Sequence, residues 1–258
     1  MNVVERIRQE LVKNPMLASL KHLLISPLLG FIYIPLGKKG LILHPKYRLK
    51  LYSHCTSVWI LVEVFEDDVY ERMFKVEKGD IVVDVGAHVG MFTVKALKEV
   101  GEEGLVIAIE PEERNFELLK RNTRGYKNVK LVKKAIGDKT GRAILYISEL
   151  SGEHSIKRSS RATKSIDVEV DTLDNILSSL GVSKVDFLKI DVEGAELEVL
   201  RGAGGYLSEG KIRKVAVAAY HYCEEHKEVA DFLSYYGFLV KKTQVKEKWY
   251  VYGWRRRT

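Results

Sequence analysis

Residues 81–90 read IVVDVGAHVG, an apolar β-branched run followed by glycines at positions 86 and 90. Such a run, entered through a Gly-Asp turn at residues 79–80, is typical of a buried strand. Glycine lets the backbone approach a ligand without a Cβ in the way, so Gly86 and Gly90 predict a tight turn into a helix over residues 91–100. The spacing is GxxxG and not the GxGxxG of dinucleotide-binding turns.

The alternation of short apolar runs and helical segments continues to the end of the chain. Further strands are expected at residues 105–109, 129–132, 185–190 and 212–219, and helices at residues 112–124, 172–180, 195–202 and 225–235. A meander is expected at residues 142–147 and 167–170, and a final edge hairpin at residues 238–242 and 249–254. This order predicts a doubly wound α/β fold, with helices on both faces of a mostly parallel sheet.

Length and charge divide the chain into two parts. Its 258 residues, 46% hydrophobic, suffice for one large domain with an extension. Residues 1–60 hold nine Lys and Arg against two Asp and Glu, whereas the remaining residues hold 33 of each sign. We therefore expect a basic N-terminal extension, residues 1–60, and an α/β domain, residues 61–258. The richness in Lys and Glu, with two glutamines, favours a source in a hot environment.

The remaining composition argues for a soluble, cytoplasmic protein. Residues 1–13 are polar and charged, unlike a signal peptide. The longest apolar run, residues 23–36, contains two prolines and a glycine and is too short to span a bilayer as a helix. Cys55 and Cys223 have no metal-binding spacing and are expected to be ordinary buried thiols in a reducing compartment.

Two further basic clusters stand outside the extension. They are Lys157, Arg158, Arg161 and Lys164, and the terminal run of residues 255–257. Each cluster is either solvated surface or a contact for an anionic acceptor, a nucleic acid or a membrane.

A second motif, Ile109-Glu-Pro111, ends the second strand. Glu110 lies 20 residues after Gly90, where a carboxylate accepts the hydroxyls of an adenosine ribose. The glycine turn and Glu110 together indicate a nucleoside ligand. The absence of a GxGxxG turn argues against a dinucleotide.

The third motif, KIDVEGAE at residues 189–196, follows the fourth parallel strand. A helix cap explains Glu196 well. It explains Asp191 and Glu193 less well, because two carboxylates at a strand end lie over the switch point of the sheet, where ligands bind.

The order and spacing of these motifs, with a TLD element at residues 172–174, resemble the FkbM family of methyltransferases between residues 80 and 205. The resemblance implies a seven-stranded class I fold and S-adenosylmethionine as cofactor. It implies that Asp84, Gly86 and Gly90, with Ala87 and His88 in the same turn, bind the methionine part, that Glu110 and Pro111 bind the ribose, and that Ala135 and Ile136 lie against adenine. Family members mostly methylate hydroxyl groups of sugars or small natural products.

Methyl transfer to a hydroxyl requires alignment of donor and acceptor and removal of a proton. The candidate bases are Asp191, Glu193 and His221, and Asp191 is also expected among the residues that bind the cofactor. His88 is expected to orient the turn. We see no convincing metal constellation, although Asp191 and His221 could share one ion.

Three interpretations stay open. The first is a methyltransferase acting on a hydroxyl of a sugar, glycan or small metabolite, with anionic acceptors among the candidates. The second is an RNA methyltransferase, which the basic clusters favour but no visible RNA-binding motif supports. The third is a catalytically silent cofactor-binding subunit. Residues 1–60 are expected to form a lid or docking element that selects the acceptor; the sequence leaves the oligomeric state open.

Overall fold

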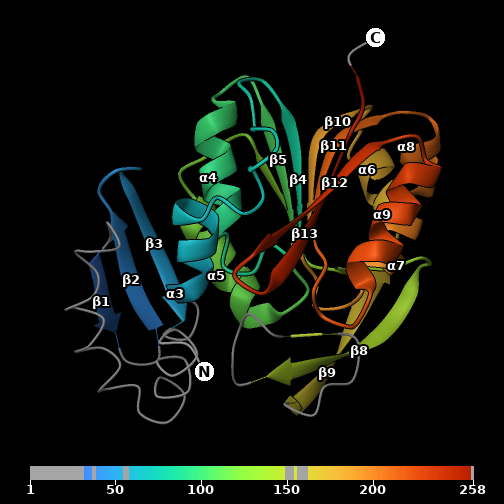
Figure 1. Cartoon of the computed structure of the whole chain (residues 1–258). Coiled ribbons are helices and arrows are strands. Elements are labelled where there is room, and N and C mark those ends of the chain that lie inside the picture. Colours follow the sequence, from blue (N-terminus) through green and yellow to red (C-terminus); the bar gives the residue numbers. More distant parts are fainter. Residues whose placement is uncertain (1–31, 37–38, 55–57, 149–153, 156–161, 257–258) are drawn as a thin grey trace.

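The computed structural model describes residues 32–36, 39–54, 58–148, 154–155 and 162–256. A central sheet lies between two layers of helices, and a smaller sheet stands at each of two sides (Figure 1). The predicted α/β fold is confirmed.

The central sheet has seven strands in the order β12-β13-β11-β10-β4-β5-β6. Strands β11, β10, β4, β5 and β6 are parallel, while β13 pairs antiparallel with β11 and with β12. The predicted parallel strands and the edge hairpin are therefore confirmed. The bounds are β4 (Ile81–Val85), β5 (Leu105–Ile109), β6 (Val129–Val132), β10 (Val185–Ile190), β11 (Ile212–Ala218), β12 (Leu239–Val245) and β13 (Lys248–Trp254).

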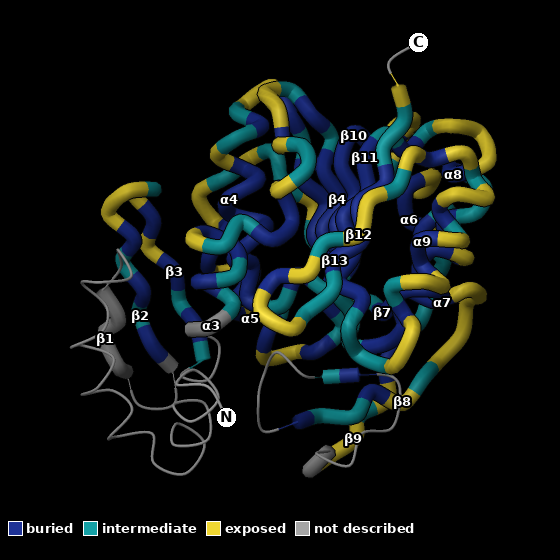
Figure 2. The backbone as a smooth tube through the Cα atoms, in the orientation of Figure 1, coloured by how far each residue is buried: buried dark blue, intermediate teal, exposed yellow. Residues whose placement is uncertain are grey.

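Helices cover both faces because the central strands are apolar on both sides, as parallel strands usually are. One core contains Val82 and Phe187 with the apolar face of α4, and the other contains Val83 and Leu188 with residues of α6 to α9. Figure 2 shows the buried strands between these layers. The helices are α4 (Met91–Val100), α5 (Glu113–Thr123), α6 (Leu173–Ser179), α7 (Glu196–Arg201), α8 (Gly204–Ser208) and α9 (Glu225–Tyr235).

The expected meander is a small sheet of its own. Strands β8 (Gly141–Ser148) and β9 (Ala162–Asp171) pair antiparallel, and β7 (Ala135–Ile136) pairs parallel with β9. This sheet lies below the carboxyl ends of the central strands in the view of Figure 1.

The described part of the N-terminal extension is an antiparallel sheet that the sequence did not predict. It consists of β1 (Ile32–Leu36), β2 (Lys39–His44) and β3 (Leu49–His54). Helix α3 (Val58–Leu61) and a π-helical turn, η2 (Val62–Glu66), lead from it to the α/β domain. Ile42 and Leu51 are buried in one core with Leu97 of α4, so this sheet packs as an added layer.

The expectation of buried thiols is wrong for Cys223, which is exposed, and Cys55 lies outside the described residues. Two further expectations also concern residues outside the described ranges. Most of the apolar run at residues 23–36 and three of the four residues of the Lys157–Lys164 cluster lie there. Among the described residues, none of the helices has the length and apolar character needed to cross a bilayer.

Candidate active site

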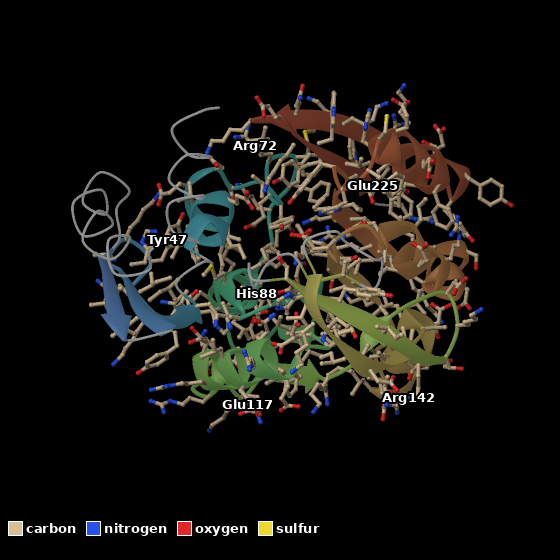
Figure 3. The ribbon with its side chains drawn as sticks, turned by 90° about the horizontal axis from the view of Figure 1, so that it is seen from below. Tyr47, Arg72, His88, Glu117, Arg142 and Glu225 are labelled. Carbon is tan, nitrogen blue, oxygen red and sulfur yellow. The ribbon has the colours of Figure 1, made fainter. Side chains whose placement is uncertain are left out.

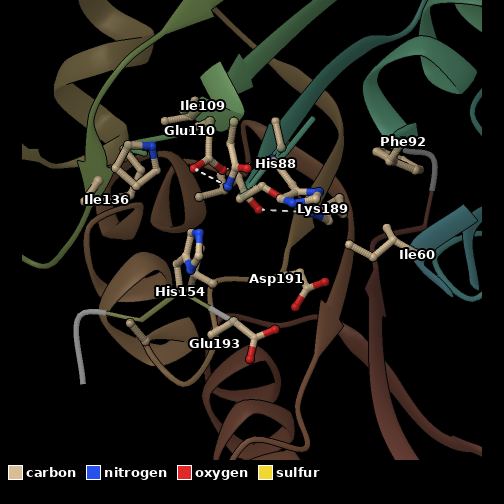
Figure 4. Close-up of a pocket in the computed structure, with 18 of the residues that line it drawn as sticks. Ile60, His88, Phe92, Ile109, Glu110, Ile136, His154, Lys189, Asp191 and Glu193 are labelled. Atoms are coloured by element: carbon tan, nitrogen blue, oxygen red, sulfur yellow. Dashed lines mark hydrogen bonds between the residues drawn. The ribbon is translucent and has the colours of Figure 1, made fainter. Parts of the chain in front are cut away.

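A cavity opens at the carboxyl ends of β4, β5 and β10, at the edge of the sheet where α/β proteins bind ligands. It holds about 870 Å³, counting solvent at its mouth (Figure 4). Predicted residues in its wall are Gly86, Ala87, His88, Glu110, Pro111, Ala135, Ile136, Asp191 and Glu193. The structure thus brings together motifs that lie up to 107 residues apart, from Gly86 to Glu193.

The glycine turn is fixed by close backbone contacts. Gly86 has φ +76°, and a Cβ there would lie 1.9 Å from the carbonyl oxygen of Asp191. The Lys189 Nζ donates to the carbonyl oxygen of Gly86 at 2.7 Å. A side chain at position 86 would therefore push apart the two strand ends that form the cavity floor.

Asp84 and Gly90 lie behind the cavity wall, although they were expected to contact the cofactor. The Asp84 carboxylate is fully buried, accepts a 2.6 Å hydrogen bond from Thr93 Oγ1 and lies 3.0 Å from Lys189 Nζ. Gly90 begins α4 with φ +88°. Both residues are placed to hold the turn in shape, and neither is in the cavity wall.

Glu110 is a buried carboxylate that faces the cavity. Its Oε2 accepts from the backbone N–H of His88 and its Oε1 from that of Glu112, both at 2.9 Å. Asn115 adds a contact from its Nδ2 at 3.5 Å. Burial raises the pKa of Glu110 to about 7, despite these donors. The carboxylate is thus held rigidly, with lone pairs left for hydroxyl donors.

Asp191 and Glu193 face the cavity away from Glu110 (Figure 4). The Tyr70 hydroxyl donates to Asp191 Oδ2 at 2.5 Å. Burial beside the Asp191 carboxylate raises the pKa of Glu193 to about 8, although the His221 ring acts in the opposite direction. Glu193 has φ +61°, a backbone conformation that favours glycine and that places its side chain after the sharp turn at the strand end.

His221 lies behind these two carboxylates and is absent from the cavity wall. Its Nε2 is 3.7 Å from Asp191 Oδ1 and 3.7 Å from Glu193 Oε2. Its Nδ1 is 3.2 Å from Glu196 Oε1 and 3.3 Å from Glu225 Oε2. Burial alone would lower the pKa of His221, but the carboxylates of Glu196 and Glu193 raise it well above its ordinary value.

The cavity wall also contains residues that sequence reasoning missed. Tyr70 and Ile60 come from the segment before the first motif, and His154 from the loop after β8. Burial lowers the pKa of His154 to about 4, so its ring is neutral near pH 7. Lys189, another residue of the wall, could have been predicted from the sequence because it is part of the KIDVEG motif.

On the face of the molecule that is seen from below, the two small sheets lie on opposite sides of this cavity. Figure 3 shows His88 near the centre of that face, with the N-terminal sheet on one side and β8–β9 on the other. The rings of His54 and His88 are 6.2 Å apart, and His54 Nε2 lies 3.1 Å from Asn115 Oδ1.

The cavity fits S-adenosylmethionine on two observations. Gly86 and Ala87 line the cavity with backbone and at most one methyl group, which suits close approach of a ligand to the backbone. Glu110 aims a fixed carboxylate into the cavity, as ribose hydroxyls require.

Sequence comparison assigns a family. The methyltransferase FkbM domain matches residues 84–240, more than half of the chain. The methyltransferase sdnD of Sordaria araneosa is 27% identical over 190 residues, which cover 60% of this chain and 73% of that protein. The 31-O-demethyl-FK506 methyltransferase FkbM of Streptomyces tacrolimicus is 26% identical over 215 residues, covering 70% and 82%.

Solved structures with similar folds include Aeropyrum pernix fibrillarin with bound S-adenosyl-L-methionine (TM-score 0.48, 13% identity, 86% of this chain and 98% of that chain). A putative rRNA-methylase from Clostridium thermocellum has a TM-score of 0.49 and 16% identity, over 74% and 94% of the two chains. The matched domain contains the glycine turn, Glu110 and the KIDVEG motif that form the cavity. The chain therefore belongs to the FkbM family of methyltransferases, and its cofactor is S-adenosylmethionine.

Proposed function

We propose that the protein transfers a methyl group to a hydroxyl of a sugar, a glycan or a small metabolite. The observation that carries this proposal is the pair of carboxylates, Asp191 and Glu193, in the cavity wall away from the proposed ribose ligand Glu110. A hydroxyl acceptor loses a proton as it attacks, and a carboxylate at that position is suited to take it.

S-Adenosylmethionine supplies a methyl group on a sulfonium, and the acceptor oxygen displaces the sulfur in line. The wall residues orient the two partners and exclude water. Glu193 accepts the acceptor proton, because a pKa of about 8 is close to the pH at which a general base works best. Asp191, fixed by Tyr70, binds the acceptor hydroxyl or the amino group of the cofactor.

We assign His221 a positioning role and not that of the base. Its raised pKa keeps the ring protonated, and it touches the carboxylates from behind. As an imidazolium it holds Asp191 and Glu193 in place.

The name of the Streptomyces relative supports an oxygen acceptor, since that protein methylates a 31-O-demethyl compound. We also propose that residues 1–60 select the acceptor. The contact of His54 with Asn115, a residue of the cavity wall, places the end of β3 beside the cofactor cavity.

A second candidate acceptor is the ribose hydroxyl of RNA. A groove between β3, α4 and α5 is lined by Arg48, Lys50, Lys98, Arg121 and Arg124, and none of the described residues in its lining has a carboxylate. The Arg121 guanidinium lies over the Tyr52 ring, 3.4 Å from its centre. Cations beside aromatic rings suit a single-stranded phosphodiester chain.

The test is a screen with tritiated S-adenosylmethionine against glycan, lipid, small-metabolite and RNA fractions. Label that is stable to base and absent with Asp191→Asn supports an ether product. Label in RNA alone selects the second candidate. Cofactor binding with no transfer to any fraction favours a catalytically silent subunit.

A further inference from the structure

Two neighbouring parallel strands bring a carboxylate and an imidazole together beside the cavity. Asp191 follows β10 and His221 follows β11, and these strands pair directly, with Ile190 opposite Val217. Two acidic residues, Glu196 of α7 and Glu225 of α9, begin the next helices and are fully buried. The result is a cluster of four carboxylates, those of Asp191, Glu193, Glu196 and Glu225, around one ring.

The cluster has more negative charge than one imidazolium balances. Four carboxyl groups surround one ring, which can carry at most a single positive charge. Lys248, the lysine that acts on Glu193, contacts Glu63 and lies 3.3 Å from the Tyr220 hydroxyl. A bound cation would balance this charge, because buried charges in proteins are paired or coordinate metals.

Several buried polar atoms of the cluster have no hydrogen bond within the described part of the chain. The His221 side chain is 8% exposed, and its Nε2 points between Asp191 Oδ1 and Glu193 Oε2 at 3.7 Å from each. Asp191 Oδ1 and Glu196 Oε2 are likewise buried without a hydrogen-bond partner among the described residues. Such atoms in a native protein call for a ligand or ion that satisfies them.

The spacing of these atoms suits a small cation. Asp191, Glu196 and His221 each offer a ligand atom, and these three atoms lie within 4.8 Å of one another. Bonds of about 2.0–2.2 Å from one ion can join atoms about 4 Å apart, so small side-chain rotations suffice. One imidazole with two carboxylates favours Mn²⁺ or Zn²⁺ over Ca²⁺, which prefers six to eight oxygen atoms.

We propose that Asp191, Glu196 and His221 bind one divalent transition-metal ion, such as Mn²⁺ or Zn²⁺, at the acceptor end of the cavity. The His221 ring, protonated in the metal-free protein, releases its proton when the ion binds. Asp191 and His221 are the two residues named in the sequence analysis as able to share one ion, and the structure adds Glu196 from the start of α7 as the third ligand.

The position of the ion gives it a role in activating the acceptor hydroxyl, and this role rests on the proposed function. Asp191 is in the cavity wall, so an acceptor hydroxyl can reach the ion beside it. A bound ion lowers the pKa of that hydroxyl. The proton of the acceptor hydroxyl passes to the Glu193 carboxylate. The hydroxyl oxygen forms a bond to the methyl carbon, and the carbon–sulfur bond breaks with its electron pair leaving on sulfur.

The experiment measures metal binding directly on the full chain. Protein stripped with a chelator, which is then removed, is titrated with Mn²⁺ by electron paramagnetic resonance and with Zn²⁺ by calorimetry. We expect one equivalent to bind, and Glu196→Gln or Asp191→Asn to weaken binding by at least about tenfold. Glu228→Gln, an exposed acid of α9, is the matched control and should bind as the parent does.

Two measurements keep the outcomes separate. S-Adenosylmethionine calorimetry on each variant shows whether the fold and the cofactor cavity are intact, so loss of metal binding by unfolding is recognised. No binding of either metal by folded protein, or binding that Glu196→Gln and Asp191→Asn leave unchanged, overturns the metal site. Full methyl transfer by metal-free protein overturns the role of the ion in activating the acceptor, while leaving the proposed function intact.

Discussion

The Tyr70 hydroxyl donates a 2.5 Å hydrogen bond to Asp191 Oδ2, across a sequence separation of 121 residues. Tyr70 is buried, and its ring packs edge-on against Phe92 of α4 and Tyr250 of β13. The segment between the N-terminal sheet and β4 therefore fixes a carboxylate at the end of β10. It is part of the site and not only a connection.

Tyr70→Phe tests this contact. The variant should lose about 1–3 kcal/mol of stability, the usual cost of leaving a buried acceptor without its donor, and turn over more slowly because Asp191 is less well held. Denaturant unfolding and methyl-transfer rates measure both effects. Tyr235→Phe, at an 85% exposed tyrosine, is the control. Equal loss in both variants would mean that the Tyr70 hydroxyl has no special role.

Gly86→Ala should abolish or strongly reduce cofactor binding. The added Cβ would lie 1.9 Å from the Asp191 carbonyl oxygen, a backbone atom that cannot move without displacing the end of β10. Gly181→Ala is the matched control, since Gly181 also has a left-handed φ of +68° but nothing within 4 Å of its added Cβ. Both variants carry the conformational cost of about 1–2 kcal/mol. Calorimetry should separate them, and equal affinities would contradict the close approach.

The local sequence is enough to identify the motifs, whereas contacts with residues distant in the chain determine the role of each motif residue. The turn at residues 86–90 could be predicted because an apolar run followed by two glycines is a local signal for a strand that turns into a helix. Asp84 was expected at the ligand, but the strand pairing places it opposite Lys189, which neutralises it beneath the turn. That pairing follows from the order of the strands in the sheet, which cannot be predicted from a short sequence motif.

The N-terminal sheet was missed for a related reason. Its last strand is held by Asn122 of α5, whose Oδ1 accepts from the N–H of Tyr52 at 2.7 Å and whose Nδ2 donates to the carbonyl oxygen of Tyr52 at 2.8 Å. The two residues are 70 positions apart. Short strands with such distant support have no strong pattern of their own, so the extension was expected without its strands.

Cofactor affinity should depend on pH through Glu110. Its pKa is raised to about 7, and ribose hydroxyls donate to the ionised carboxylate. Below pH 7 the carboxyl group is protonated and loses acceptor strength, so the dissociation constant should rise by up to about tenfold per pH unit as the pH falls. Above pH 7 it should level off. Calorimetry from pH 5.5 to 8.5 checks this.

The Glu110 variants provide the control for that pH dependence. Glu110→Ala should weaken binding by about 1–3 kcal/mol at pH 8. Glu110→Gln should bind with an affinity that does not change through pH 7. A pH step that survives in Glu110→Gln would assign the titration to another group.

Glu193→Gln should lower the methyl-transfer rate by about 10²–10⁴-fold while cofactor affinity changes little, because the residue is proposed to act on the acceptor proton. In the parent protein the rate should rise with pH and level off above the pKa of about 8, since the ionised form is the base. Asp191→Asn should likewise reduce turnover more than cofactor binding. Unchanged single-turnover rates in both variants would place the base elsewhere.

Charge reversal in the groove should reveal whether the N-terminal sheet selects the acceptor. Removing residues 1–57 would take Ile42 and Leu51 out of the core, so the truncated chain is expected to unfold. Lys50→Glu with Arg48→Glu alters two exposed groove side chains and leaves the core intact. Cofactor affinity should stay as it is, because neither residue reaches the cavity wall.

For an anionic acceptor, the KM of the double variant should rise on the order of tenfold, because the groove then repels the acceptor. The difference from the parent should shrink as salt is added, since screening weakens long-range attraction between exposed charges. Lys241→Glu, at an exposed lysine of β12, controls for net charge. Equal KM values for the parent, the groove variant and this control would show that acceptor binding does not use the groove, and the selecting element would have to lie elsewhere.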